Sequence, residues 1–212
     1  MLEDAQQGGW NFIVQKYMEQ PLLIGSDLRK CDIRLWICVT SWNPAVVWAW
    51  SDPYFRLASR PFTWDKTQVS DPFVHLTNRT VQKELGDAKA ELPSEDEPHI
   101  WLLPAFLSWA QEGLPNISGG ASDRWTSFTW PRILEAVRMA VRSCKEDVGA
   151  HPAGCFELFG FDFLLDSEMR PWLLEANSSP DLCEDAGPSL REMTETALAE
   201  MLQLKIGLQD CR

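Results

Sequence analysis

The stretch KCDIRLWICVT, residues 30–40, predicts the centre of the fold. Its apolar run from Ile33 to Thr40 is typical of a β-strand. Because side chains alternate along a strand, Lys30, Asp32 and Arg34 lie on one face and the apolar residues between them on the other. Three adjacent charges on one face form either a solvated edge or the wall of a binding site. The spacing alone leaves both interpretations open.

Further short apolar runs flank this stretch and are separated by turn residues. Trp42-Asn43-Pro44 predicts a hairpin turn, since Asn and Pro adopt the backbone angles of a tight reversal. We expect the N-terminal part to form an antiparallel meander. Its other strands are expected at 12–14, 45–50 and 54–58.

The middle of the chain changes in character. Residues 86–124 are acidic, Pro-containing and then Gly/Ser-rich, which indicates a flexible loop or insertion, with a short helix expected at 100–110. Residues 125–146 repeat apolar side chains at the spacing of an amphipathic helix. Thr129 and Pro131 place the start of its regular part near residue 130.

The C-terminal part predicts two apolar strands and a helix. The strands are expected at 156–165 and 171–176, joined by a polar hairpin loop at 166–170, and the helix at 189–204. The whole pattern predicts an α+β fold of antiparallel sheets with packed helices. Most tryptophans on or beside the strands are expected to pack against these sheets: Trp36, Trp42, Trp48, Trp50 and Trp172.

Two carboxylates and an amide lie in the C-terminal strands. Asp162 and Glu175 sit among apolar residues, where an unpaired charge costs several kcal/mol, so a compensating cation is expected. Glu175 and Asn177 are two residues apart and face the same way. This set of oxygen donors suits Mg²⁺. The alternatives are an ion pair with Arg170 or Lys205, or exposure at a sheet edge.

Other sites have weaker support from the residues alone. Gln15-Lys16-Tyr17-Met18 follows a predicted strand and could line an adenine pocket. His75, in His75-Leu76-Thr77-Asn78, belongs to a dense polar cluster, and the residues alone favour a structural role for it. The chain has neither the P-loop pattern nor the dinucleotide fingerprint.

The composition indicates a globular and strongly acidic protein. Its 212 residues carry 31 Asp and Glu against 19 Lys and Arg, a formal net charge of −12. This balance argues against general binding of nucleic acid or of an anionic membrane. The apolar runs are far shorter than the roughly 20 residues that span a bilayer, and the N-terminus lacks the features of a signal peptide. An intracellular location is expected, with the six cysteines as free thiols.

Six blocks of sequence together resemble the tubulin tyrosine ligase-like family of ATP-grasp amino-acid ligases. They follow one another in the family's order and cover most of residues 12–182. No single block identifies the family, but the order of all six does. The blocks are VQKY (14–17), KCDIRLW (30–36), YFRLAS (54–59), HLTN with VQKE (75–84), FELFGFDF (156–163) and WLLEANSSP (172–180).

The resemblance implies an ATP-grasp-like fold and a role for individual residues. It implies that Arg34 and Arg56 are catalytic and face the phosphate and the acidic acceptor. The implied ATP-binding residues are Gln15, Lys16, Tyr17 and Met18 in the adenine hinge, Lys30 and Asp32 at the nucleotide, and His75, Thr77 and Asn78 in a loop over the ribose and phosphates. The implied Mg²⁺ ligands are Asp162, Glu175 and Asn177.

The implied reaction is an ATP- and Mg²⁺-dependent ligation. An acceptor carboxylate attacks the γ-phosphate of ATP to give an acyl phosphate, and the amine of a free amino acid then displaces phosphate. Trp42-Asn43-Pro44 and the FELFG block look most like the glycylase branch, which attaches glycine to glutamate side chains of tubulin tails. The alternatives are a polyglutamylase or tyrosine ligase, a non-catalytic remnant that binds a protein partner, and a ligase for a small-molecule acid.

The resemblance also sets expectations for the chain as a whole. Residues 1–212 correspond to one partial ATP-grasp region, because family members carry an N-terminal domain and phosphate-contacting lysines before the hinge, and only 14 residues precede Gln15 here. Tubulin or microtubule tails as the substrate imply a cytoplasmic place on the cytoskeleton, cilium or flagellum. Since such tails are acidic, a local basic patch is expected from Arg29, Lys30, Arg34, Arg56 and Arg60.

Overall fold

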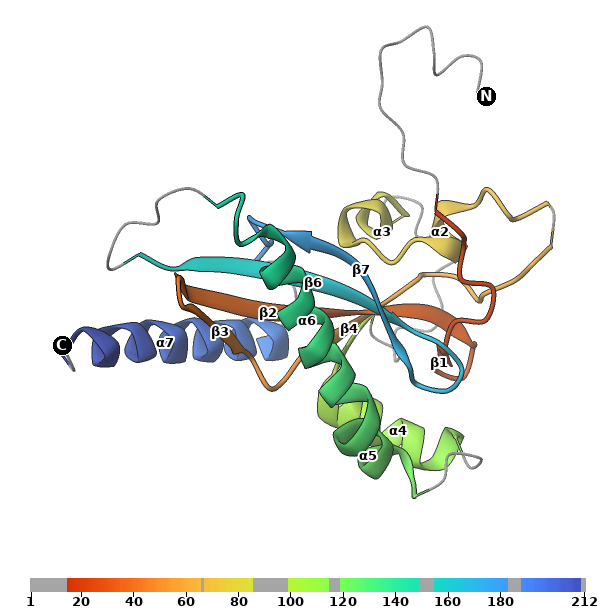
Figure 1. Cartoon of the computed structure of the whole chain (residues 1–212). Coiled ribbons are helices and arrows are strands. Elements are labelled where there is room, and N and C mark those ends of the chain that lie inside the picture. Colours follow the sequence, from red (N-terminus) through yellow and green to blue (C-terminus); the bar gives the residue numbers. More distant parts are fainter. Residues whose placement is uncertain are drawn as a thin grey trace, which may run out of the picture.

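We describe the protein from a computed structural model, which covers residues 15–65, 67–85, 99–114, 119–148, 155–182 and 188–210. An antiparallel sheet with the strand order β5-β4-β2-β6-β7 forms the centre, and helices pack on it (Figure 1). The strands are β1 (Leu23–Ile24), β2 (Arg29–Trp42), β3 (Ala45–Ala49), β4 (Tyr54–Leu57), β5 (Ile100–Leu102), β6 (Glu157–Leu165) and β7 (Pro171–Asn177). The α+β, antiparallel fold class predicted from the sequence is confirmed.

The 14-residue strand β2 organises this sheet. Its residues 33–39 pair with β6 on one edge. On the other edge β4 pairs with residues 31–34 and β3 with residues 37–42. The predicted meander is therefore wrong at β4, which returns to β2 instead of pairing with β3. The physical reason is the length of β2, which accommodates two short strands end to end along one edge.

The predicted hairpins are present. β2 and β3 reverse at Asn43-Pro44, and β6 and β7 reverse through residues 166–170. The pairing of β6 with β7 shifts by one residue: Phe163 faces Leu173 and Asp162 faces Glu175, so Leu174 is an extra, bulged residue. The strand expected at 12–14 lies outside the described residues.

Helices pack on both faces of the sheet. The helices are α2 (Pro72–His75), α3 (Arg79–Leu85), α4 (Leu103–Gly113), α5 (Ala121–Arg124), the π-helix η1 (Trp125–Thr129), α6 (Trp130–Cys144) and α7 (Pro188–Asp210). The start of regular helix near 130 and the C-terminal helix are confirmed. Residues 100–102 of the helix expected at 100–110 form β5 instead, because their backbone pairs with β4. Of the predicted loop or insertion, residues 86–98 and 115–118 lie outside the described part.

The two faces of β2 are buried differently. Its odd-numbered residues from Cys31 to Val39 join the main core, together with apolar residues of α4, η1 and α6. On the opposite face, Trp36 and Cys38 pack against Leu190, Ala197 and Met201 of α7. The charged residues 30, 32 and 34 share this second face, on the part of β2 that precedes Trp36. The sheet face that carries the charges is thus bounded by the docked helix α7.

The remaining general expectations concern membranes and thiols. No described helix is both long and apolar enough to cross a membrane. The described cysteines Cys31, Cys38, Cys144 and Cys155 are free thiols, as predicted. Cys183 and Cys211 lie outside the described residues.

Candidate functional site

A cleft of about 560 Å³ is lined by nearly all the residues that were predicted to bind ligands or take part in catalysis. Small-molecule sites commonly have volumes of about 300 to 1,000 Å³. Of the predicted site residues, only Arg34 and Asn177 are absent from its lining. The predicted residues that line it are Gln15, Lys16, Tyr17, Met18, Lys30, Asp32, Arg56, His75, Thr77, Asn78, Asp162 and Glu175.

The three charged residues of β2 are buried. Lys30 is 6% exposed, Asp32 3% and Arg34 6%. The solvated edge left open by the spacing is therefore wrong: Lys30 and Asp32 line the cleft, and Arg34 is buried outside its lining. The expected basic patch is wrong as well, because Arg29, Lys30, Arg34 and Arg56 are all buried.

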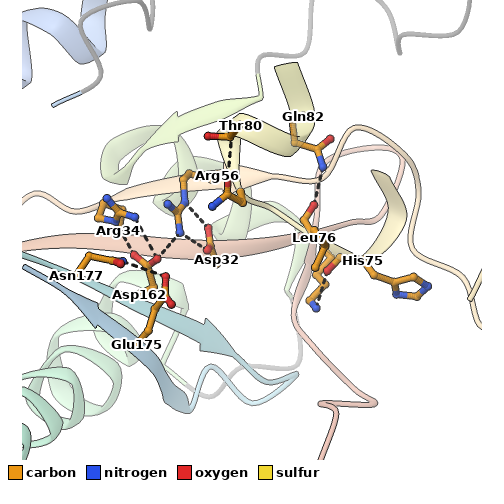
Figure 2. Close-up of polar contacts among 12 residues, drawn as sticks. Asp32, Arg34, Arg56, His75, Leu76, Thr80, Gln82, Asp162, Glu175 and Asn177 are labelled. Carbon is orange, nitrogen blue, oxygen red and sulfur yellow. Dashed lines mark hydrogen bonds and ion pairs between the residues drawn. The ribbon is translucent and has the colours of Figure 1, made fainter. Parts of the chain in front are cut away.

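Four charges alternate in sign across three strands (Figure 2). Arg34 on β2 donates from Nε to Asp162 Oδ1 on β6 at 2.5 Å and from Nη2 to Oδ2 at 3.1 Å. Arg56 on β4 donates from Nε to Asp32 Oδ1 at 2.8 Å, and its Nη2 contacts both Asp32 Oδ2 and, at 2.9 Å, Asp162 Oδ2. Asp162 is thus held by two arginines. Its compensating cations are these arginines, not Arg170.

Cross-strand register explains this arrangement. Arg34 is the direct partner of Asp162, and Asp32 is the direct partner of Arg56, so each pair of opposite charges is placed side by side by the ladder. Burial alone would lower the pKa of Arg56, but Asp32 and Asp162 raise that pKa above its ordinary value. The guanidinium therefore remains charged, and the four-residue network is neutral as a whole.

Lys30 is held beside the hinge by a second polar group. Its Nζ donates to Tyr17 Oη and to the carbonyl oxygen of His75, both at 2.9 Å. Tyr17 Oη also lies 2.9 Å from His75 Nδ1. Burial lowers the pKa of Lys30, and burial together with the Lys30 charge lowers the pKa of His75. This group joins β2, the hinge and α2 at one end of the cleft.

Aromatic rings pack against Tyr17 and His75 at this end of the cleft. The Trp64 ring lies 5.5 Å from the Tyr17 ring, and the Phe62 ring lies 5.6 Å from the His75 ring. Trp64 Nε1 also donates to the carbonyl oxygen of Glu19, at 3.2 Å. The hinge is thereby fixed to the segment that leads to α2. No role was predicted for Trp64 or Phe62 from the sequence.

The polar loop at 75–78 is anchored to the sheet through Gln82. Gln82 Nε2 donates to the Leu76 carbonyl at 2.7 Å, and Gln82 Oε1 accepts from the backbone N–H of Ser59 at 2.8 Å (Figure 2). Asn78 Oδ1 accepts from the N–H of Thr80 at 2.9 Å and so satisfies the start of α3. This use of Asn78 shows that one predicted ligand-contact side chain also stabilises its own loop.

The predicted metal ligands come together on β6 and β7. Asp162 and Glu175 are cross-strand partners, and Asn177 Nδ2 donates to Glu175 Oε1 at 3.0 Å, which confirms that Glu175 and Asn177 face the same way (Figure 2). The carboxylate oxygens and the amide oxygen form a hard donor set. No cluster of three His, Cys, Asp or Glu that could hold a metal occurs in the described part of the chain. Two carboxylates and one amide would suit Mg²⁺ only with waters and phosphate oxygens as further ligands, which is how proteins usually bind this ion.

Apolar cleft residues were missed by sequence reasoning. Leu164, Trp172, Leu173 and Leu174 line the cleft, and Trp172 is 50% exposed. The expectation that Trp172 packs into the sheet is wrong. The bulge at Leu174 puts Trp172 on the same face as Glu175, although their positions are three apart along the strand. An unbulged strand would have placed them on opposite faces.

We expect Asp32→Asn to lower the free energy of unfolding by about 3 to 5 kcal/mol, since it leaves two buried guanidinium groups to share one carboxylate. Urea unfolding at pH 7 measures this loss. Glu135→Gln is the matched control, because it breaks an exposed pair with Arg138 and should cost less than about 1 kcal/mol. Equal effects of the two substitutions would contradict the assignment of a buried network.

Acidification should destabilise the protein through His75. Because the pKa of His75 is lowered by burial and by Lys30, the unfolded chain takes up this proton at a higher pH than the folded chain. The free energy of unfolding should therefore fall as the pH drops below about 6.5, the ordinary histidine pKa. Urea unfolding from pH 7.5 to 5.5 should show a shallower fall for His75→Gln than for the parent chain. Parallel profiles would show that His75 does not titrate this way.

Comparison with known proteins places this site in a family. The family model of the "Tubulin-tyrosine ligase family" matches residues 2–210. Tubulin monoglycylase TTLL3 of Danio rerio is 34% identical over 180 residues, covering 85% of this chain and 22% of the relative. Protein monoglycylase TTLL8 of Mus musculus is 35% identical over 171 residues, covering 81% and 19%. Tubulin polyglutamylase TTLL5 of Homo sapiens is 36% identical over 184 residues, covering 85% and 14%.

The chain thus spans about a fifth or less of the length of these relatives. The family is ATP-grasp-like, in agreement with the antiparallel sheet and packed helices described above. The match covers nearly the whole chain and includes every residue of the cleft. The chain belongs to the tubulin-tyrosine ligase family.

Proposed function

We propose that this chain forms the nucleotide- and magnesium-binding part of an ATP-dependent ligase that attaches an amino acid, glycine, to glutamate side chains of tubulin tails. One observation carries the proposal. The hinge, Lys30, the loop at 75–78 and the carboxylates Asp162 and Glu175 line a single cleft beside the buried arginines. The family and its glycylase members support the type of reaction.

The two ends of the cleft have different proposed roles, one in binding adenine and the other in binding phosphate. In the proposed complex, Gln15 to Met18 contact the adenine edge, while the apolar surface of Leu164, Trp172 and Leu174 excludes water around the base. Lys30, fixed by Tyr17 and the His75 carbonyl, meets the phosphates as a positioned positive charge. Its buried surroundings strengthen that electrostatic interaction.

Phosphoryl transfer requires that the phosphate charge be neutralised and that the attacking and leaving groups be aligned. It needs no side-chain nucleophile. Arg56 and Arg34 would stabilise the negative charge that develops as the acceptor carboxylate attacks the γ-phosphate and again as the amine displaces phosphate. Asp162, Glu175 and Asn177 would hold Mg²⁺, which would neutralise phosphate charge when bound. The cross-strand ladder fixes Asp162 opposite Glu175, so both carboxylates are oriented before a ligand arrives.

The arginine network has a consequence for the order of binding. In the described structure both oxygens of Asp162 accept from arginine side chains. A divalent cation that approaches Asp162 therefore meets two positive charges, and binding is disfavoured until an anion compensates for them. The polyphosphate of ATP supplies such an anion, so the metal and the nucleotide should bind together.

Mutual dependence of ATP and Mg²⁺ tests this part of the proposal. Calorimetric titration should show ATP binding at least about tenfold more tightly with Mg²⁺ than without it, and no measurable Mg²⁺ binding without nucleotide. Glu175→Gln should abolish the dependence on Mg²⁺. Glu168→Gln is the control, since its side chain is exposed in the β6–β7 loop. Unchanged Mg²⁺ dependence in Glu175→Gln would sink the metal assignment.

Labelled amino acids test the reaction. The full chain, incubated with ATP, Mg²⁺ and microtubules, should transfer labelled glycine in preference to labelled glutamate or tyrosine, and microtubules whose tails have been removed by proteolysis should accept none. Transfer of glutamate would favour the polyglutamylase alternative, which the similarity to TTLL5 supports. If the chain binds MgATP but transfers none of the three amino acids, it is a nucleotide-binding module without ligase activity. A tubulin substrate would place the protein on the cytoskeleton or in a cilium.

A further inference from the structure

We infer that Gly160 is a positioning residue: the absence of a side chain at this position lets Arg34 lie flat across β6 and reach Asp162. The link to catalysis rests on the proposed function of Arg34 and Asp162. The positioning itself rests on packing and can be tested without any ligand or turnover.

Gly160 lies at the crossing of three segments. It is the cross-strand partner of Trp36 on β2 and of Asn177 on β7. It shares a face of β6 with Asp162, two residues further along. Arg34 comes from the neighbouring strand, and Pro180 follows β7. All these segments converge on the one position of β6 that carries no Cβ.

The space above Gly160 is already filled. A Cβ at this position would lie 3.0 Å from Arg34 Nη1, 3.1 Å from Arg34 Cδ and 2.9 Å from Pro180 Cβ. Carbon atoms in contact normally lie about 3.5 to 4.0 Å apart. A methyl group would therefore require Pro180 to shift, and it would also push the Arg34 side chain, whose Nη1 and Cδ lie closer than an ordinary contact, by a few tenths of an ångström.

Backbone conformation does not explain the glycine. The described glycines with positive φ are Gly25, Gly119 and Gly120, and Gly160 is not among them. A residue with a side chain could adopt the backbone of β6 here. Glycine inside a strand weakens it, and such a position often marks the close approach of another group. The close approach at Gly160 is that of the Arg34 side chain.

Displacement of Arg34 would act on Asp162. Arg34 is 6% exposed and donates two hydrogen bonds to this carboxylate. If a methyl group at position 160 moves the guanidinium, Asp162 keeps only Arg56, which it shares with Asp32. The carboxylate then loses the contact that fixes its orientation along β6. Gly160 thus acts on the metal-ligand carboxylate through Arg34.

The arginine Nε–H signals in an NMR spectrum report this contact directly. We expect the Nε–H signals of Arg34 and Arg56 to exchange slowly with water in the parent chain, and Arg34→Lys and Arg56→Lys to assign them. In Gly160→Ala the Arg34 signal should exchange at least tenfold faster, while the Arg56 signal keeps its position. Gly207→Ala is the control, because no atom lies within 4 Å of the added methyl group there. An unchanged Arg34 signal in Gly160→Ala would overturn the inference.

A double-mutant cycle covers the case in which Gly160→Ala is too unstable for NMR. The shift in the urea midpoint caused by Gly160→Ala should be smaller in an Arg34→Ala background, since the clash with Nη1 and Cδ is then absent. Equal shifts in both backgrounds would refute a role through Arg34. Titration of the parent chain with MgATP is read separately. A failure to bind would overturn the proposed function and leave the packing result standing.

Discussion

The burial of the Asp162 carboxylate is the constraint on which the site depends. A carboxylate that is 4% exposed on a central strand must be compensated, and here the compensation comes from two arginines on two other strands. Those arginines require β2 and β4 to pair in one register. The same register puts Lys30 beside the hinge and Asp32 opposite Arg56. The compensation of the Asp162 charge therefore depends on the same strand register that forms the cleft and places the proposed metal ligands.

The network also bears on the proposed binding of phosphate by a protein with a net charge of −12. Arg34 and Arg56 are buried and paired with carboxylates, so they add little to the field outside the protein. Their charge becomes available only where an incoming anion replaces a carboxylate partner. Under the proposed function, we expect such a site to favour ligands that bring several negative charges at once, as a polyphosphate does.

The sequence predicted features that arise from local patterns. The alternation at 30–40 and the apolar runs at 156–165 and 171–176 identified the strands, and the spacing at 125–146 identified α6. The pairing of β4 with β2 was not predictable, because it depends on the full length of β2. The partners of Asp162 were missed for a similar reason: Arg34 is 128 residues away along the chain, and no local pattern joins them. The exposure of Trp172 in the cleft depends on a bulge that leaves no mark in composition.

The bulge at Leu174 changes which side chains of β7 share a face. Because of it, Trp172 before the bulge and Glu175 after it lie on the same face of the strand. Loss of either residue between Trp172 and Glu175 would restore regular pairing and leave these two side chains on the same face of the strand. Loss of one residue after Glu175 would instead turn Asn177 away from the carboxylate. The donor set is therefore encoded by strand length as strictly as by residue identity.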